Sequence, residues 1–179
     1  VTVLFLDLRG FTLRSEAWPP EDVVDYLNAV FGIAIPLVVA RGGVVHQLLG
    51  DGLMALFGFP TPSPEAPANA VGTALAVAAE IEAACEAGRL PETKLGIGVH
   101  TGECVVGPVG TEAHREFKVT GDVVNVTARI EKLCKAHGAC VLVSEVLYDR
   151  LGDAAPPAER LGPISLDGRQ EPVAVVRLA

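Results

Sequence analysis

Apolar residues fill almost all of the first eight positions of the chain, a pattern typical of a strand buried in the middle of a sheet. The one charge in this predicted strand, over residues 1–8, is Asp7 near its C-terminal end. After Pro19 and Pro20 the apolar residues recur at helical spacing, which predicts a helix that begins there. We expect Pro36 to kink or end this helix, because proline lacks the amide hydrogen of one helical hydrogen bond.

The rest of the chain alternates apolar runs with glycine- and proline-rich turns. Gly50-Asp51-Gly52 lies between two apolar runs and is a strong hairpin signal. The expected elements are strands 44–49 and 53–57, a helix over 68–87, a hairpin of strands 94–100 and 104–109 that turns at 101–103, a helix over 122–137, a strand over 140–143, a short helix from Ser144 to about residue 151, and strands near 164 and over 173–178.

The order of these elements, β-α-β-β-α-β followed by a further helix and strands, indicates the fold class. It predicts an α+β sandwich of ferredoxin-like type with appended C-terminal elements. A length of 179 residues fits a single domain over 1–179, and an apolar fraction of 50% supplies a sizeable core. Because Val1 already lies inside an apolar run, we expect the chain to be excised from a longer multidomain protein with a fused regulatory domain.

Composition and charge narrow the possible function classes. Lys and Arg total 14 against 22 Asp and Glu, so the chain lacks the concentrated positive charge that phosphate backbones require, and we expect no nucleic-acid partner. We also expect no membrane segment, because glycine, proline or charge interrupts every apolar run before the ~20 residues of a membrane helix. Four cysteines without a Cys-x-x-Cys pair favour free thiols in a reducing, cytoplasmic compartment over a zinc site.

Two carboxylates are the first candidates for chemistry. Asp7 ends a buried strand and Asp51 tips a hairpin with apolar flanks, and an unpaired carboxylate in such surroundings is costly. A divalent cation such as Mg²⁺ would neutralise both, since it takes oxygen ligands from carboxylates and substrate phosphates. The alternative is that Asp51 is only a turn residue and Asp7 a strand-end cap. Gly10, shortly after the strand, would let backbone amides face a bound phosphate.

The predicted helix over 122–137 has two faces. Its apolar residues form a stripe suited to packing on the sheet, whereas Asn125 and Arg129 are four residues apart and share another face. An apolar stripe opposite a polar stripe is ordinary for a surface helix. The functional alternative is an arginine clamp on phosphates, with the asparagine orienting a reacting hydroxyl.

Three segments together resemble the catalytic domains of class III nucleotidyl cyclases. Residues 5–12, Phe-Leu-Asp-Leu-Arg-Gly-Phe-Thr, resemble the first metal motif of that family, and residues 49–58, Leu-Gly-Asp-Gly-Leu-Met-Ala-Leu-Phe-Gly, resemble the second. Residues 121–131, Gly-Asp-Val-Val-Asn-Val-Thr-Ala-Arg-Ile-Glu, resemble the helix that carries the transition-state residues. The segments lie in the family's order and at family-like spacings, and they cover the chain to about residue 145.

The resemblance implies an enzyme that converts ATP, or GTP, to a 3′,5′-cyclic nucleotide and pyrophosphate by two-metal catalysis. Two Mg²⁺ or Mn²⁺ ions per site help deprotonate the ribose 3′-hydroxyl and hold the triphosphate. The implied metal-binding residues are Asp7, Asp51 and Leu8, and the implied phosphate-binding backbone is that of Gly10, Phe11 and Thr12.

In the family the site lies between two subunits, so the resemblance also implies a homodimer. One chain would supply the metal aspartates. The other would supply Asn125, to orient the ribose, and Arg129, to stabilise charge on the α-phosphate.

The chain departs from the family at the positions that read the base. Adenylyl cyclases usually have lysine where this chain has Gln47, and aspartate or threonine where it has Lys118; guanylyl cyclases usually have glutamate and a small residue there. Gln47 offers both a donor and an acceptor to either purine. Lys118 could pair with Glu116, or reach the base in place of the missing lysine, and a relaxed base pocket is the simplest interpretation.

Two basic residues are further candidates for phosphate binding. Arg115 precedes Lys118 on a segment that in the family brings a basic residue to the phosphates. Arg169 follows Asp167-Gly168, where family members usually carry lysine and glycine, and it could replace that lysine.

These features support an adenylyl cyclase-type enzyme with ATP as substrate, the choice of ATP being a family expectation. A degenerate cyclase-like module that binds nucleotide with little turnover, or a guanylyl or relaxed-specificity cyclase, is the alternative. A diguanylate cyclase relative fits less well, because the Gly-Gly-acid hairpin of that group is absent from the sequence.

Overall fold

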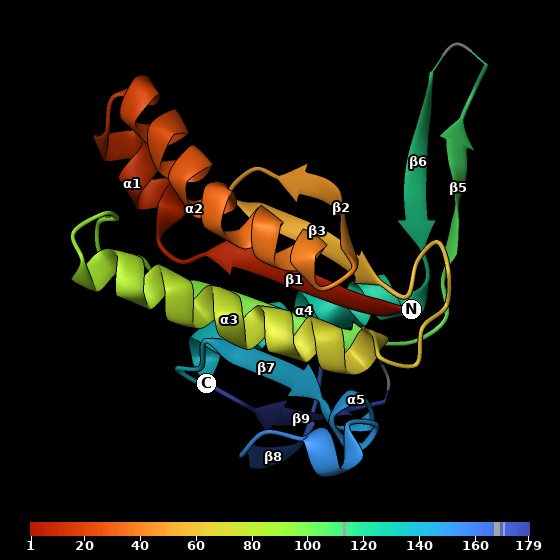
Figure 1. Cartoon of the computed structure of the whole chain (residues 1–179). Helices are drawn as coiled ribbons and strands as arrows, with labels where there is room; N and C mark the ends of the chain where they lie inside the picture. The colour runs from red at the N-terminus through yellow and green to blue at the C-terminus, as the bar shows by residue number, and fades with distance from the viewer. Residues whose placement is uncertain (113, 167–168, 170) are drawn as a thin grey trace.

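A sheet with the strand order β2-β3-β1-β4-β7-β9-β8 forms the centre of the computed structural model, which describes residues 1–112, 114–166, 169 and 171–179 (Figure 1). The strands of this sheet are β1 (Thr2–Leu8), β2 (Gly43–Leu49), β3 (Gly52–Phe57), β4 (Leu95–Thr101), β7 (Val141–Ser144), β8 (Glu159–Ile164) and β9 (Val173–Arg177). The helices are α1 (Phe11–Ala17), α2 (Pro20–Ala40), α3 (Ala66–Glu86), α4 (Asp122–Ala136) and α5 (Glu145–Asp149), with a 3-10 turn at Gly152–Ala154.

The topology confirms the ferredoxin-like prediction. β1 pairs antiparallel with both β3 and β4, and β2 lies outside β3, which is the strand arrangement expected of a βαββαβ unit. The appended part begins with α4, which crosses over so that β7 pairs parallel with β4. β9 and then β8 extend the sheet antiparallel from β7.

Helices cover both faces of the sheet, as Figure 1 shows, and the side chains of β1 alternate between them. Leu4, Leu6 and Leu8 are buried in the core cluster that includes the buried residues of α2 and α3. On the other face, Val3 and Phe5 pack in a cluster with Val123 of α4. Asp7 continues this second series, so its side chain belongs to the face that α4 covers.

The helix α2 runs through Pro36 to Ala40. Of the two expected effects of Pro36, a kink or the end of the helix, the end is therefore wrong. Pro36 lies on the exposed side, and Gly32 one turn earlier is surrounded by open space. Ala34 and Val38, on either side of the proline, are buried. Their packing compensates for the one missing backbone hydrogen bond.

Two helices in the described part of the chain, α2 and α3, are long and apolar enough to cross a membrane by length and composition alone. The expectation that every apolar run falls short of that length is therefore wrong. Both helices bury a face in the core, for example through Val30 of α2 and Ile81 of α3. Core helices of soluble proteins pass the same test of length and composition.

The hairpin expected between residues 94–100 and 104–109 does not form. β4 is buried along most of its length and pairs with β1 and β7, whereas β5 (Val105–Gly110) pairs with β6 (Arg115–Thr120). The β5–β6 ribbon projects away from the sheet (Figure 1). A strand that is buried on both faces needs a hydrogen-bonded partner on each edge. In the central sheet β1 and β7 occupy both edges of β4, so β5 pairs with β6 instead.

α1 has no counterpart among the expected elements. Gly10, which directly precedes α1 as its N-cap, has a left-handed backbone with φ of 73°, and no side chain caps the helix. The helix is held instead by Arg14, whose guanidinium lies 4.9 Å from the ring centre of Trp18 and 4.7 Å from that of Tyr26. The contact with Tyr26 joins α1 to α2, and local sequence pattern does not reveal such packing between helices.

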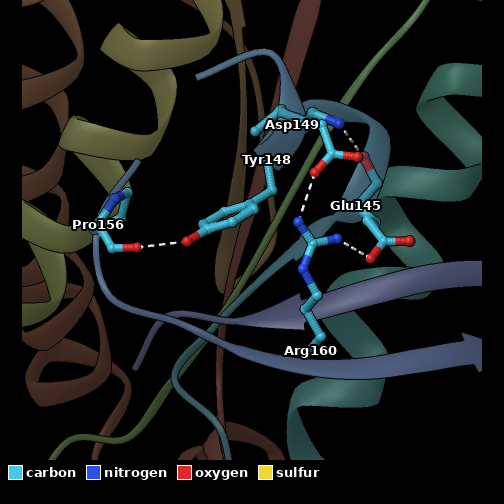
Figure 2. Close-up of polar contacts among 7 residues, drawn as sticks. Glu145, Tyr148, Asp149, Pro156 and Arg160 are labelled. Atoms are coloured by element: carbon cyan, nitrogen blue, oxygen red, sulfur yellow. Dashed lines mark hydrogen bonds and ion pairs between the residues drawn. The ribbon is translucent and has the colours of Figure 1, made fainter. Parts of the chain in front are cut away.

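The predicted short helix after Ser144 is confirmed, since the Ser144 hydroxyl accepts a hydrogen bond from the Leu147 amide. Figure 2 shows how this helix, α5, holds β8: Arg160 forms ion pairs with Glu145 and with Asp149, the latter at 2.8 Å. The Tyr148 hydroxyl donates to the Pro156 carbonyl at 2.7 Å. These contacts attach the appended strands to the body of the domain.

Candidate active site

The first predicted metal residue, Asp7, lies at the end of β1 on the face that α4 covers. Its partner in the register with β4 is Gly96, so no side chain from β4 stands beside it. Burial raises the pKa of Asp7, and the nearby Asp51 raises it further, while the Leu8 amide and Lys132 oppose the shift.

The second, Asp51, lies in the turn between β2 and β3 and is brought to Asp7 by the glycine that follows it. A Cβ on Gly52 would lie 2.5 Å from the Leu6 carbonyl oxygen and 3.1 Å from Oδ1 of Asp7. Only glycine allows this approach of the two strands. Burial also raises the pKa of Asp51. The structure thus brings together two carboxylates that are distant in sequence.

Both aspartates line one cavity of about 400 Å³, whose lining is Asp7, Leu8, Arg9, Gly10, Phe11, Thr12, Asp51, Glu131, Lys132 and Lys135. The segment predicted to bind phosphate therefore lies beside the carboxylates predicted to bind metal. The side chain of Leu8 is buried in the core on the opposite face, so its backbone is what it offers the cavity.

Sequence reasoning missed three of the charged residues in this cavity: Arg9, Glu131 and Lys135. Glu131 and Lys135 are four residues apart on α4, and they lie on a different face of that helix from Asn125 and Arg129. The signal that could have found them is the Gly96-Ile97-Gly98 pattern in β4, because two glycines on one face of a strand allow a helix to approach closely.

Glu131 is half-buried, and burial, followed by the charge of Asp7, raises its pKa to about 7. The described residues contain no group of three or more His, Cys, Asp or Glu side chains placed to hold one metal ion. The cavity therefore offers the two carboxylates of Asp7 and Asp51 as candidate ligands, with the Glu131 carboxyl group in its wall and room for water and phosphate oxygens. That donor set fits Mg²⁺ or Mn²⁺, which retain waters and bind substrate phosphates.

The transition-state candidates lie elsewhere on the same chain. Asn125 is exposed on α4, and Arg129 lines a separate cavity of about 220 Å³ with Lys132, Leu133, Ser165 and Leu166. Arg169 forms an ion pair with Asp122 in the first turn of α4, so it lies at the helix end nearer to Asn125. None of these three lines the Asp7 cavity.

The base-reading candidates are also apart from that cavity. Gln47 is exposed on the edge strand β2, and Arg115, a candidate for phosphate binding, is exposed on β6. Lys118 on β6 forms an ion pair of 2.5 Å with Glu116, one of the alternatives that the sequence left open. Asp167, which stands where family members usually carry lysine, lies outside the described residues.

The family model described as the adenylate and guanylate cyclase catalytic domain matches residues 1–176. The chain belongs to this cyclase family. It is 36% identical over 156 residues to adenylate cyclase 1 of Rhizobium meliloti, a match that covers 86% of this chain and 24% of the relative. Curated relatives of this cyclase domain are much longer, and it spans about a third of their length or less.

Solved cyclases have the same fold as this domain. The adenylyl cyclase CyaB of P. aeruginosa superimposes with a TM-score of 0.88 at 25% identity, over 99% of this chain and 92% of that one. The guanylyl cyclase Cya2 superimposes with a TM-score of 0.81 at 33% identity, over 99% and 90%. Both substrate types thus occur among the proteins that the cyclase domain resembles.

Proposed function

We propose that the chain is the catalytic domain of an adenylate cyclase that converts ATP to 3′,5′-cyclic AMP and pyrophosphate. The observation that carries the proposal is the convergence of Asp7 and Asp51 on one cavity with the backbone of Gly10, Phe11 and Thr12. Carboxylates beside a glycine-containing backbone segment suit a triphosphate that arrives with divalent cations.

Asp7 and Asp51 would hold two Mg²⁺ or Mn²⁺ ions, with the Leu8 backbone beside them. When bound, these ions supply an activated ribose 3′-hydroxyl and neutralise phosphate charge. The raised pKa values of both carboxyls support this role, because burial disfavours their charged forms, repulsion from Asp51 adds to this at Asp7, and a bound cation would offset both effects. Lys132 and Lys135 add positive charge to the same cavity.

Asn125 and Arg129 would form a second half of the active site, apart from the metal-binding half at Asp7 and Asp51. Asn125 would orient the ribose, and Arg129 would stabilise charge on the α-phosphate. Arg169 would join them, since its ion pair with Asp122 places it at the start of the same helix. Because these groups lie outside the Asp7 cavity, one chain holds two incomplete half-sites. A homodimer in which each cavity faces the α4 helix of the partner would complete both.

The β5–β6 ribbon offers a surface for that dimer. Val105, Val109 and Phe117 expose 73%, 54% and 69% of their area. Three large apolar side chains exposed on one two-stranded ribbon are typical of an interface. The greater length of the curated relatives supports a fused regulatory domain, and the nucleotide substrate supports a cytoplasmic location.

A guanylate cyclase is the second candidate, because the identity to the guanylyl cyclase Cya2 is 33%, against 25% to the adenylyl cyclase CyaB. The decisive experiment incubates the purified domain with Mn²⁺ and either ATP or GTP, and identifies the product by mass spectrometry. We expect cyclic AMP to be the main product. Cyclic GMP as the main product would select the second candidate, and no cyclic product from either nucleotide would favour a binding module.

The matched variant for this assay is Asp51→Ala. It should abolish metal-dependent turnover and leave the fold intact, because a turn residue contributes little to the core. Circular dichroism of the variant supplies the control. Full activity in the folded variant would remove Asp51 from the metal site.

A further inference from the structure

Helix α4 lies directly on the backbone of β4, without intervening side chains at two positions. A Cβ on Gly98 would collide with the Glu131 amide nitrogen and would lie 2.7 Å from the Thr127 carbonyl oxygen. A Cβ on Gly96 would collide with Oε1 of Glu131. The Glu131 carboxylate therefore occupies the space that a side chain on Gly96 would fill.

That space is next to Asp7. Gly96 and Asp7 are partners in the register of β4 and β1, and side chains of such partners lie on the same face, about 5 Å apart at Cβ. Glu131 lines the same cavity as Asp7 and Asp51. Two glycines and the close approach of a helix thus place a carboxyl group in the wall behind the aspartates, and a cation bound there would favour its charged form.

Among the described residues, no basic side chain forms an ion pair with Glu131. The salt bridges among the described residues do not include it, although Arg9 and Lys132 are close enough to influence it. A half-buried acid without an ion-pair partner costs stability. A purely space-filling group over Gly96 would have no need of that charge.

We propose that Glu131 is a positioning residue that strengthens divalent-cation binding at Asp7 and Asp51 through its negative charge, without ligating the ion itself. The described residues hold no group of three His, Cys, Asp or Glu side chains placed to bind one ion, so the proposal gives Glu131 an indirect role. The inference rests on the proposed function. It gives α4 two roles. One face of the helix carries the transition-state residues Asn125 and Arg129, and the other supports the metal cavity of its own chain through Glu131.

The test measures Mn²⁺ binding by electron paramagnetic resonance, in the absence of nucleotide. Glu131→Gln keeps the size of the side chain and removes its charge, so packing over Gly96 is retained. We expect the Kd for Mn²⁺ to rise about tenfold or more, within the range typical of groups outside the first ligand shell. Glu80→Gln, which removes the same charge from an exposed position on α3, should leave the Kd unchanged.

A second variant approaches the same carboxylate from the strand. Gly96→Ala introduces a Cβ that displaces the Glu131 side chain, and it should also raise the Kd for Mn²⁺. An unchanged Kd in folded Glu131→Gln overturns the inference and leaves the metal site intact. If the unaltered domain binds no Mn²⁺, or if Asp7→Asn binds it as well as the unaltered domain does, the metal role of the aspartates fails as well.

Discussion

His100 is a half-buried residue of β4 whose Nδ1 lies 2.7 Å from the Ser144 hydroxyl. Burial lowers its pKa to about 4; Arg169 and Arg150 act in the same direction, and Asp122 opposes them. In the unfolded chain its pKa is near 6.5. Between these values the unfolded state binds a proton that the folded state does not, so stability is lost as the pH falls below about 6.5.

We therefore predict that the titration of His100 lowers the free energy of unfolding by about 2 kcal/mol at pH 5 relative to pH 7.5. Urea denaturation of the unaltered domain and of His100→Gln at both pH values measures this contribution as the difference between their pH dependences. Equal pH dependences would show that His100 is not the titrating group. A generally lower stability of the variant does not affect the comparison, because each protein is its own reference.

Gln47 and Lys118 belong to the residue scale as well, because the proposed substrate choice depends on them. If they face the base in the dimer, two mismatched contacts impose little penalty on the wrong purine. The double variant Gln47→Lys with Lys118→Asp installs the pair usual in adenylyl cyclases, and it should favour ATP over GTP more than the parent does. Each single variant should gain less, since the two side chains act as a pair.

The measurement is the ratio of kcat/KM for the two nucleotides in all four proteins. A parent that already selects one purine strongly, together with an unchanged ratio in the double variant, would show that these residues do not read the base. Glu116, which pairs with Lys118 in the structure, must release it for the proposed contact. Surface ion pairs of this kind are weak, so that release costs little.

At the scale of elements, the β5–β6 ribbon is the feature with the clearest consequence. Phe117 exposes 69% of its area, so Phe117→Ser removes no core packing and should leave the circular dichroism spectrum of the folded domain unchanged. It should weaken self-association, which sedimentation velocity measures over a range of concentrations. Val24→Ser on α2, where the parent side chain is 55% exposed, is the control and should associate normally. Unchanged association of Phe117→Ser would remove that side chain from the interface.

At the scale of the whole molecule, the separation of the two half-sites predicts complementation. Asp51→Ala and Arg129→Ala should each be inactive alone, because every site of either homodimer lacks one essential group. A mixture should recover activity, since one of the two sites in a heterodimer is complete. Mixed chains that exchange subunits and remain inactive would show that each site is built within one chain.

Much of the fold was predictable because its signals are local. The apolar run of β1, the glycine turn at Asp51, the amphipathic α4 and the Ser144 cap depend on residues close in sequence, and each was predicted. The arrangement of β1 to β4 agrees with the predicted βαββαβ pattern, because few topologies satisfy it. The motifs around Asp7, Asp51 and Asn125 also identified the family before any contact was known.

The tertiary structure decided the features that depend on distant partners. β4 pairs with β1 and β7, so β5 was left to pair with β6 in a ribbon that local patterns had assigned differently. The buried packing of Ala34 and Val38 stabilised α2 so that the helix continued beyond Pro36. Glu131 reached Asp7 only because glycines in β4 let α4 approach. Local sequence determined most of the elements, since hydrogen bonding and hydrophobic periodicity are local, whereas long-range packing determined α1, the partner of β5 and which side chains meet.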